Sequence, residues 1–294
     1  MAIHAVNLKE VEELQETIKK IQSTIREDAS YREDIENQRG QYTSIKKYLE
    51  YQVRFLMYSH EIPEAPFYRI RKINNSLDHY NTVSDLIYPK AEIVKSERMN
   101  NASFRVLYTS LNELTAMSEA RINTASIGQK FQLTQFKSEQ PIRSYSLGDF
   151  SRAHLNLPRK SSLYKDFCLK YLGDIHTDHV VQGYAALECV LYKVLYNTDD
   201  LSYLLSSLLA DAIFTAHESI EAITYPTQQS SFGVNIAFRQ NAAEKLKIEH
   251  SYVNELTGIY SNGFYTYKTL KSCSDFSNPQ DLLFEDSKPN SGYY

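Results

Sequence analysis

The feature that most constrains this chain is a short strand that runs directly into a helix, between Arg98 and Glu119. Apolar and polar side chains alternate from 104 to 109, which is the period of a β-strand. Ser110 or Asn112 can then cap a helix, because a side-chain oxygen accepts hydrogen bonds from the free N–H groups of a first helical turn. Glu119 therefore lies on a helix that begins where the strand ends, a position from which a carboxylate can reach a ligand cleft. A glutamate that is merely exposed on a helix is the alternative.

Composition places the chain among ordinary globular proteins. Its 294 residues, 23% of them charged and 42% hydrophobic, suffice for one large domain with an accessory segment. The net charge of −4 gives no general attraction to nucleic acid or anionic membranes. No apolar run reaches the roughly 18 residues that span a bilayer, and the N-terminus lacks a signal-peptide pattern. We therefore expect a cytoplasmic protein without nucleic-acid or membrane partners.

Several common site types are poorly supported. The cysteines Cys168, Cys189 and Cys273 are too few and too scattered for a disulfide framework or a zinc site, so we expect buried thiols. The sequence His-Thr-Asp-His at 176–179 has no further ligand at helical spacing, which argues against a metal. There is no G-x-S-x-G motif of a serine hydrolase. There is also no G-x-G-x-x-G loop, which argues against a dinucleotide used as a hydride carrier.

The N-terminal segment has the pattern of two helices. Apolar residues recur every three or four positions from Val11 to Ile25, and the pattern breaks at Asp28. Ser30 and Glu33 form a capping box for a second helix that continues to about 59 and ends before Pro63. Such a pair can be a hairpin packed on the main domain, or an element for oligomerisation or partner binding.

The rest of the chain mixes strands and helices. Strands are predicted at 67–73, at 130–137 and 142–147 as a pair, at 222–225, at 234–238 and at 263–270. Helices are predicted around 164–171, 182–195, 201–219 and 242–247. We divide the chain into an N-terminal helical segment, 1–62, a main domain, 63–274, and a tail, 275–294. The tail is expected to be weakly ordered and to dock through Leu282, Leu283 and Phe284.

Short motifs follow one another in a characteristic order. They are FYRIRKI, ERMNN, VLYTS, LTAMSEAR and ITYPTQQSSFGVNIAF. This order, over about two thirds of the chain, resembles the RES family, a branch of the ADP-ribosyltransferase-like fold named for an arginine, a glutamate and a serine. The resemblance implies an α+β fold: a split β-sheet core with flanking helices, preceded here by the N-terminal helical hairpin.

The resemblance also implies a site. Arg69 and Glu119 match the family's arginine and glutamate. Thr227 stands where the family usually has serine after Tyr-Pro, so either its hydroxyl substitutes or Ser230 or Ser231 takes the role. A second departure is the missing glycine beside the ERMNN motif. The other expected binding residues are Tyr68, Arg98, Asn100, Tyr108, Ser230, Ser231 and Asn235, the last of which can also be structural.

The implied chemistry is cleavage of the nicotinamide–ribose bond of NAD, consumed as a substrate without a metal. Glu119 would stabilise the positive charge that develops on the ribose, and Arg69 would bind the pyrophosphate. Tyr68 and Tyr108 would pack against the nicotinamide ring. Family members are commonly bacterial toxins held in check by an antitoxin. The ADP-ribose acceptor, which can be water, phosphate or a protein, is left open, and a catalytically degenerate binding or scaffold module is the alternative function.

Overall fold

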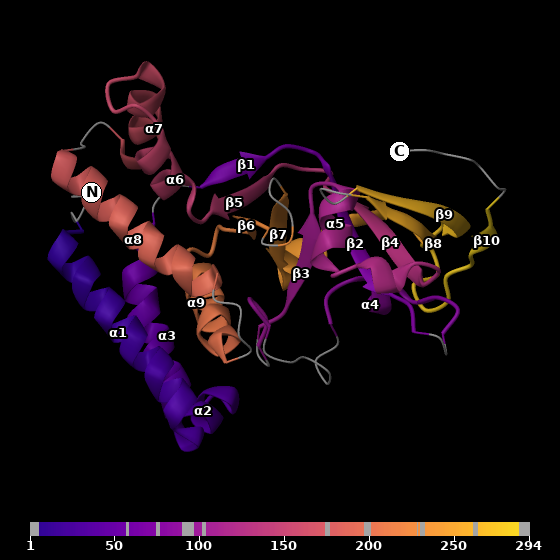
Figure 1. Ribbon diagram of the computed structural model, residues 1–294, viewed down its shortest axis with the longest axis horizontal. Coiled ribbons are helices and arrows are strands. Elements are labelled where there is room, and N and C mark those ends of the chain that lie inside the picture. The colour runs from indigo at the N-terminus through magenta and orange to yellow at the C-terminus, as the bar shows by residue number, and fades with distance from the viewer. Residues whose placement is uncertain are drawn as a thin grey trace. The chain divides into compact units, whose positions relative to one another are not determined.

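The computed structural model describes residues 6–56, 59–74, 77–89, 97–101, 104–173, 177–196, 201–227, 229, 233–260 and 264–287. The chain divides into two compact units (Figure 1). The first comprises Met1–His60, Val94–Arg105 and Arg143–Ile223, and the second comprises Glu61–Ile93, Val106–Ile142 and Thr224–Tyr294. Most of the helical residues lie in the first unit and most of the strand residues in the second. This confirms the predicted α+β class with a helical N-terminal region.

The first unit begins with a well-capped helix, α1 (Leu8–Glu27). Asn7 Oδ1 accepts the N–H of Glu10 at 2.9 Å, and Glu10 Oε2 accepts the N–H of Asn7 at 3.2 Å, which completes a capping box. The next helix, α2 (Ala29–Glu36), is capped by Asp28. Asp28 Oδ1 accepts the N–H groups of Ser30 and Tyr31, so the capping box predicted at Ser30 is wrong by two residues.

The segment predicted as one second helix is two helices, α2 and α3 (Gly40–Val53). The break lies at 37–39, where Gln38 adopts a φ of 56°, a left-handed conformation that is incompatible with a continuing helix. The Arg39 N–H donates to the Asp34 carbonyl at 2.8 Å and closes the turn. Without a proline or glycine before Gly40, no strong sequence signal marks this break.

The apolar side of α1 is covered by helices of its own unit. Val11, Leu14, Ile18 and Ile25 are buried. The helix α1 packs against α8 (Asp178–Tyr196), and α3 packs against α9 (Ser202–Ala216), as Figure 1 shows. The structure therefore agrees with the hairpin alternative. Self-association stays a prediction, and it would have to use the outer surface of these helices.

A buried carboxylate joins two further helices of the first unit. Glu188 of α8 is fully buried, and its Oε2 accepts the N–H of Ser151 in the first turn of α6 (Asp149–Asn156) at 2.7 Å. Its Oε1 accepts the Tyr145 hydroxyl at 2.9 Å. Burial raises the pKa of Glu188, while these hydrogen bonds act to lower it. The helix α7 (Ser162–Leu172) follows α6.

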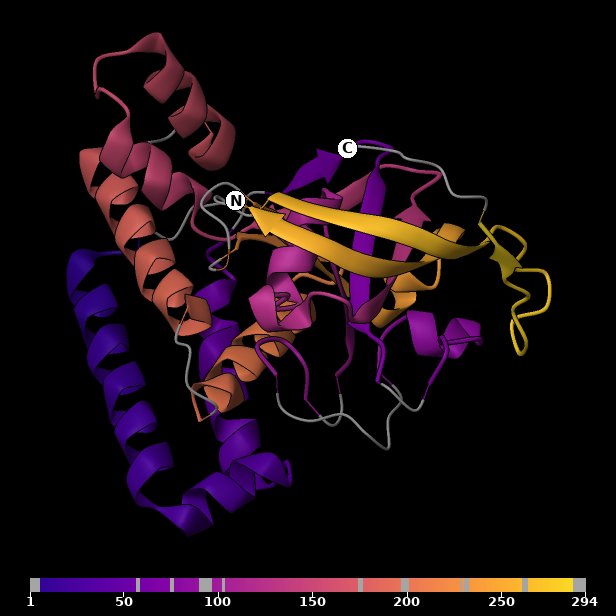
Figure 2. The same cartoon turned by 45° about the vertical axis from the view of Figure 1, so that its right-hand side comes forward.

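The second unit is built on an antiparallel sheet. Its strand order is β7 (Val234–Arg239), β3 (Val106–Ser110), β2 (Pro66–Lys72), β4 (Lys130–Lys137), β8 (Lys247–Tyr260), β9 (Phe264–Cys273) and β10 (Glu285–Asp286). β8 and β9 form the long yellow hairpin of Figure 2. The division between the units falls within β1 (His60–Ile62), β5 (Ile142–Ser146) and β6 (Ala222–Pro226). Because β4 pairs with β2 and β8, the predicted pairing of 130–137 with 142–147 is wrong.

This sheet is split between β2 and β3. β2 pairs with β4 along its whole length, from Pro66 to Lys72, and β3 pairs with β7 from Val106 to Ser110. Between β2 and β3, the register consists of a single pair, Tyr68 and Ser110. The two halves of the sheet are therefore joined in register at Tyr68 of β2 and at Ser110, the last residue of β3.

Short elements and the tail complete the second unit. The short elements are α4 (Val83–Leu86), α5 (Glu113–Glu119), the 3₁₀ turn η2 (Thr124–Ser126) and α10 (Gln240–Ala243). The predicted helix at 242–247 is wrong beyond 243, because α10 ends there and β8 begins at Lys247. In the tail, Leu282 is buried and its N–H donates to the Asn81 carbonyl at 2.6 Å. The Phe284 ring lies 4.5 Å from that of His79, so docking through these two residues is confirmed. Leu283 is 77% exposed and does not take part.

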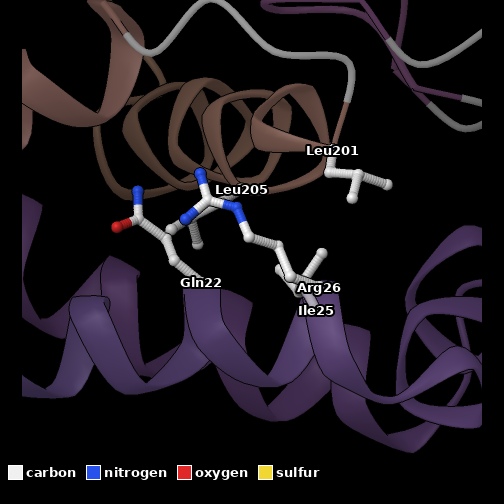
Figure 3. Close-up of a pocket in the computed structure, with 5 residues that line it drawn as sticks. All are labelled: Gln22, Ile25, Arg26, Leu201 and Leu205. Atoms are coloured by element: carbon white, nitrogen blue, oxygen red, sulfur yellow. The ribbon is translucent and has the colours of Figure 1, made fainter.

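A shallow hollow lies between α1 and α9 in the first unit (Figure 3). Gln22 and Arg26 extend from α1 toward Leu205 of α9 and occupy much of the space between the two helices. We assign no ligand to it. Among the helices that the structure describes, none is long and apolar enough to cross a membrane.

The packing of α1 gives a prediction about stability. Leu14 is fully buried, so Leu14→Ala should lower the free energy of unfolding by about 2–5 kcal/mol, because it leaves a cavity beneath α1. Leu8→Ala on the same helix is the control, since Leu8 is 45% exposed and its removal should cost less than about 0.5 kcal/mol. Denaturant unfolding measures both. Equal effects of the two substitutions would contradict the packing described here.

Candidate active site

The helix α5 is held firmly on the sheet of the second unit. It packs against β2, β3 and β7. Asn112 caps it by accepting the N–H of Thr115 at 2.8 Å, which confirms one of the two predicted caps. Met117 is fully buried in an apolar cluster with Ile122, Phe131, Leu133, Leu256 and Tyr265. Glu119, the last residue of the helix, is half-buried at its end.

A hydrogen bond joins Glu119 to Thr227, which lies 108 residues further along the chain. Thr227 Oγ1 donates to Glu119 Oε1 and accepts the Gln229 N–H at 2.9 Å. The Thr227 N–H donates to the Gly233 carbonyl at 3.0 Å. The hydroxyl is therefore used as both donor and acceptor, which fixes its direction toward the carboxylate.

Gly233 makes this contact possible by having no side chain. A Cβ atom added to Gly233 would lie 2.5 Å from Thr227 Cγ2 and 2.6 Å from Thr115 Cγ2. Real Cβ atoms do not approach other atoms so closely, so a larger residue would push Thr227 away from α5. The glycine is required by this close approach and not by an unusual φ.

Three further polar residues form a row on the face of the sheet that α5 covers. Tyr68 packs against the Met117 cluster, which places it on this face. Ser110 is the register partner of Tyr68 on one side and of Asn235 on the other. Directly paired residues of antiparallel strands project to the same face, so Tyr68, Ser110 and Asn235 share it. The half-buried Tyr108, two residues before Ser110, also projects there.

Asn235 has an unusual hydrogen-bonding state. Its side chain is buried, with 2% of the residue exposed, and its Oδ1 accepts the Ser110 hydroxyl at 2.8 Å. Its Nδ2 is shielded from solvent and has no hydrogen-bond partner among the described residues. A buried amide donor without a partner is uncommon in folded proteins.

Two carboxylates act on the phenol of Tyr68. Burial, and then the charges of Glu113 and Glu249, raise the pKa of Tyr68, so its phenol stays neutral at physiological pH. Glu113 Oε2 accepts the Tyr267 hydroxyl at 2.6 Å, and Glu249 Oε2 accepts Gln135 Nε2 at 2.8 Å. Glu249 Oε1 also lies 3.6 Å from Lys137 Nζ, which compensates part of its charge, so Glu113 is the carboxylate that most favours a cationic group beside Tyr68.

Arg69 lies at the split of the sheet. Because side chains alternate along β2, it projects to the face opposite Tyr68 and Ile70, and its Nη1 lies 3.5 Å from the Tyr108 carbonyl oxygen. Arg71, on the same face, donates from Nη2 to the Ile87 carbonyl at 3.1 Å and has a structural role. The structure thus brings Glu119 and Thr227 together, while a pyrophosphate contact of Arg69 stays a prediction.

The remaining predicted residues belong to the first unit or are not described. Arg98 and Asn100 belong to the first unit, where Asn100 is buried and its Nδ2 donates to Glu97 Oε2 at 2.7 Å. Ser230 and Ser231 lie outside the described residues. No group of three or more histidine, cysteine, aspartate or glutamate side chains that could hold a metal occurs in the described part of the chain.

Sequence reasoning did not identify Ser110 as a site residue or Glu113 as a charged neighbour of Tyr68. The sequence predicts Ser110 only as a potential helix cap, whereas it is the last residue of β3 and its side chain contacts Asn235. The missing signal is the strand register, because only the pairing of β3 with both β2 and β7 puts these polar residues in one row.

Comparison with known proteins adds one match. A protein-family model described as the RES domain matches residues 66–255. The matched region begins at β2 and contains Arg69, Glu119, Thr227 and Asn235. No curated protein matches the chain.

Proposed function

Because the RES-domain model covers more than half of its length, the chain belongs to the RES family, and we propose that it consumes NAD by cleaving the bond between nicotinamide and ribose. The observation that carries this proposal is the hydrogen bond from Thr227 to Glu119, since it joins the two residues that match the family's serine and glutamate motifs. It also supports Thr227 as the residue that takes the role of the serine.

The Glu119 carboxylate suits this reaction. When nicotinamide leaves with the electron pair of the broken bond, positive charge develops on the ribose carbon and ring oxygen, and a nearby carboxylate stabilises it. Thr227 holds Oε1, which leaves Oε2 of Glu119 for a ribose hydroxyl. The half-buried position of Glu119 strengthens its electrostatic effect relative to a fully exposed carboxylate.

The two tyrosines on the sheet face that α5 covers suit the leaving group. The nicotinamide ring of NAD carries a positive charge before cleavage, and a tyrosine ring attracts a cation over its face. Tyr68 and Tyr108 are half-buried on the α5 face, and the charges of Glu113 and Glu249 act on Tyr68. We assign these two tyrosines to the nicotinamide ring. Arg69 projects to the opposite face, so we assign it to the pyrophosphate through the split, where its Nη1 lies 3.5 Å from the Tyr108 carbonyl oxygen.

The biological role follows from the family. We propose a bacterial toxin or defence effector that is controlled by an antitoxin or another regulatory protein. Water, phosphate and a protein side chain are all chemically competent acceptors of the ADP-ribose, and mass spectrometry of the products distinguishes them. The second candidate is a catalytically degenerate binding or scaffold module, which the threonine at 227 and the missing glycine in the ERMNN motif favour.

Glu119→Gln tests the catalytic assignment. Glutamine keeps an acceptor oxygen for Thr227 but removes the charge, so the rate of nicotinamide release should fall about a hundredfold or more. The free energy of unfolding should change by less than about 0.5 kcal/mol. The control is Glu36→Gln, because Glu36 is likewise the last residue of a helix but is exposed in the first unit. An unchanged rate in Glu119→Gln, or no nicotinamide release by the parent protein, favours the scaffold alternative.

Arg69→Ala tests the pyrophosphate contact. Loss of a charged hydrogen-bond donor should weaken NAD binding by about 10- to 100-fold in calorimetry, and Arg69→Lys should recover only part of this, because a forked contact becomes a point charge. Arg71→Ala is the matched control, since Arg71 lies on the same strand and face but contacts the Ile87 carbonyl. If Arg69→Ala only lowers stability, as Arg71→Ala is expected to do, Arg69 is a structural residue of the split sheet.

A further inference from the structure

The side-chain amide of Asn235 is held in one orientation by Ser110. Ser110 Oγ donates to Asn235 Oδ1 at 2.8 Å, which assigns Oδ1 as the accepting end and Nδ2 as the donating end. Asn235 is 2% exposed and Ser110 is also 2% exposed, so water does not compete for this contact. The donor Nδ2 is left without a partner among the described residues.

This unpaired donor lies on the same side of the sheet as the Glu119–Thr227 pair. Gly233 precedes Asn235 by two positions, and a Cβ on Gly233 would point at Thr115 and Thr227. Along extended backbone, residues two apart project to the same side, so the Asn235 side chain does too. Register adds Tyr68 to the same row through Ser110.

The neighbours of Asn235 select a particular kind of acceptor. Tyr68 and Tyr108, on the same face, offer aromatic surface for a flat ring, and the carboxylates around Tyr68 disfavour an anionic group there. A donor beside such a surface fits a ring that carries an uncharged carbonyl oxygen. The nicotinamide of NAD is such a ring, because its carboxamide stands directly on the aromatic carbon skeleton.

We propose that Asn235 Nδ2 donates a hydrogen bond to the carboxamide oxygen of the nicotinamide ring, and that Ser110 is the positioning residue that holds the Asn235 amide in the required orientation. This inference rests on the proposed function, which it deepens by naming the substrate atom that is recognised. It gives the unpaired donor a partner in the complex. It also makes the enzyme specific for dinucleotides whose base carries a carbonyl group.

The chain contains a matched control for this residue. Asn254 of β8 is also fully buried, its Oδ1 accepts the Thr269 hydroxyl at 2.8 Å, and its Nδ2 has no partner among the described residues. Three strands, β3, β2 and β4, separate its strand from that of Asn235. Substitution of Asn254 therefore repeats the loss of such an amide on another strand. Its register partner Phe131 belongs to the Met117 cluster, so the control also reports any effect that passes through the packing beneath α5.

The experiment compares two NAD analogues in the full-length Glu119→Gln variant, so that turnover does not consume the ligand. In one analogue the base is 3-acetylpyridine, which keeps the carbonyl oxygen, and in the other it is 3-methylpyridine, which lacks it. Calorimetry should show about tenfold tighter binding of the acetyl analogue, the effect of one buried hydrogen bond. Asn235→Leu should reduce this ratio to about twofold or less, Ser110→Ala should reduce it partly, and Asn254→Leu should leave it unchanged.

Each outcome decides the matter. A ratio near one without the Asn235 substitution, or a ratio that Asn235→Leu leaves intact, overturns the inference. If the Asn235→Leu variant does not fold, two other results test the inference. They are the affinity ratio in protein that retains Asn235 and the change in that ratio caused by Ser110→Ala. If the analogues bind with the expected ratio but the parent protein releases no nicotinamide from NAD, the proposed reaction is wrong and the recognition of the carbonyl stands. If neither NAD nor the analogues bind, both fail.

Discussion

The hydrogen bond from the Thr227 hydroxyl to the Glu119 carboxylate depends on three parts of the second unit being in place together. The helix α5 must be held on the sheet by Met117 and its apolar neighbours, so that Glu119 lies at the end of a fixed helix. The chain after β6 must bring Thr227 to that end, and Gly233 must leave room for it against Thr115. A carboxylate and a hydroxyl that are positioned by packing need little rearrangement when charge develops on a substrate.

The split of the sheet between β2 and β3 is the second structural feature on which the proposed site depends. At the one register pair between β2 and β3, Tyr68 and Ser110 bring aromatic and polar groups to the α5 face. Beyond that pair, the Arg69 side chain lies 3.5 Å from the Tyr108 carbonyl oxygen, where β2 and β3 are no longer register partners. A cationic ring and an anionic pyrophosphate make opposite electrostatic demands. We therefore assign the nicotinamide ring to the surroundings of Tyr68, with the nearby Glu113, and the pyrophosphate to the Arg69 guanidinium at the split.

Local sequence patterns predict this fold well where the alternation of a strand or the periodicity of a helix is regular, and poorly where it is interrupted. The alternation of KFQLTQFK gave β4 with its observed bounds, and Asn112 was one of two predicted caps for α5. β8 was missed because its register shifts at Val253/Asn254 and Leu256/Gly258 break the alternation. The sequence also left open which hydroxyl would meet Glu119, because a loop of threonine, glutamine and serine has no periodicity. The role of Ser110 beside Asn235 depends on pairing between strands distant in the chain, and local patterns do not encode such pairing.

The central claim is that the hydroxyl at 227 acts on Glu119 in an NAD-cleaving site. The most direct test is the rate of nicotinamide release by purified Thr227→Ser and Thr227→Val. Serine restores the residue that the family usually has and keeps the donor, so its rate should stay within about threefold of the parent. Valine has nearly the shape of threonine but no hydroxyl, and loss of a hydrogen bond to a charged group should slow release by about 10- to 100-fold. Equal rates for the two variants, with both folded, would contradict the account.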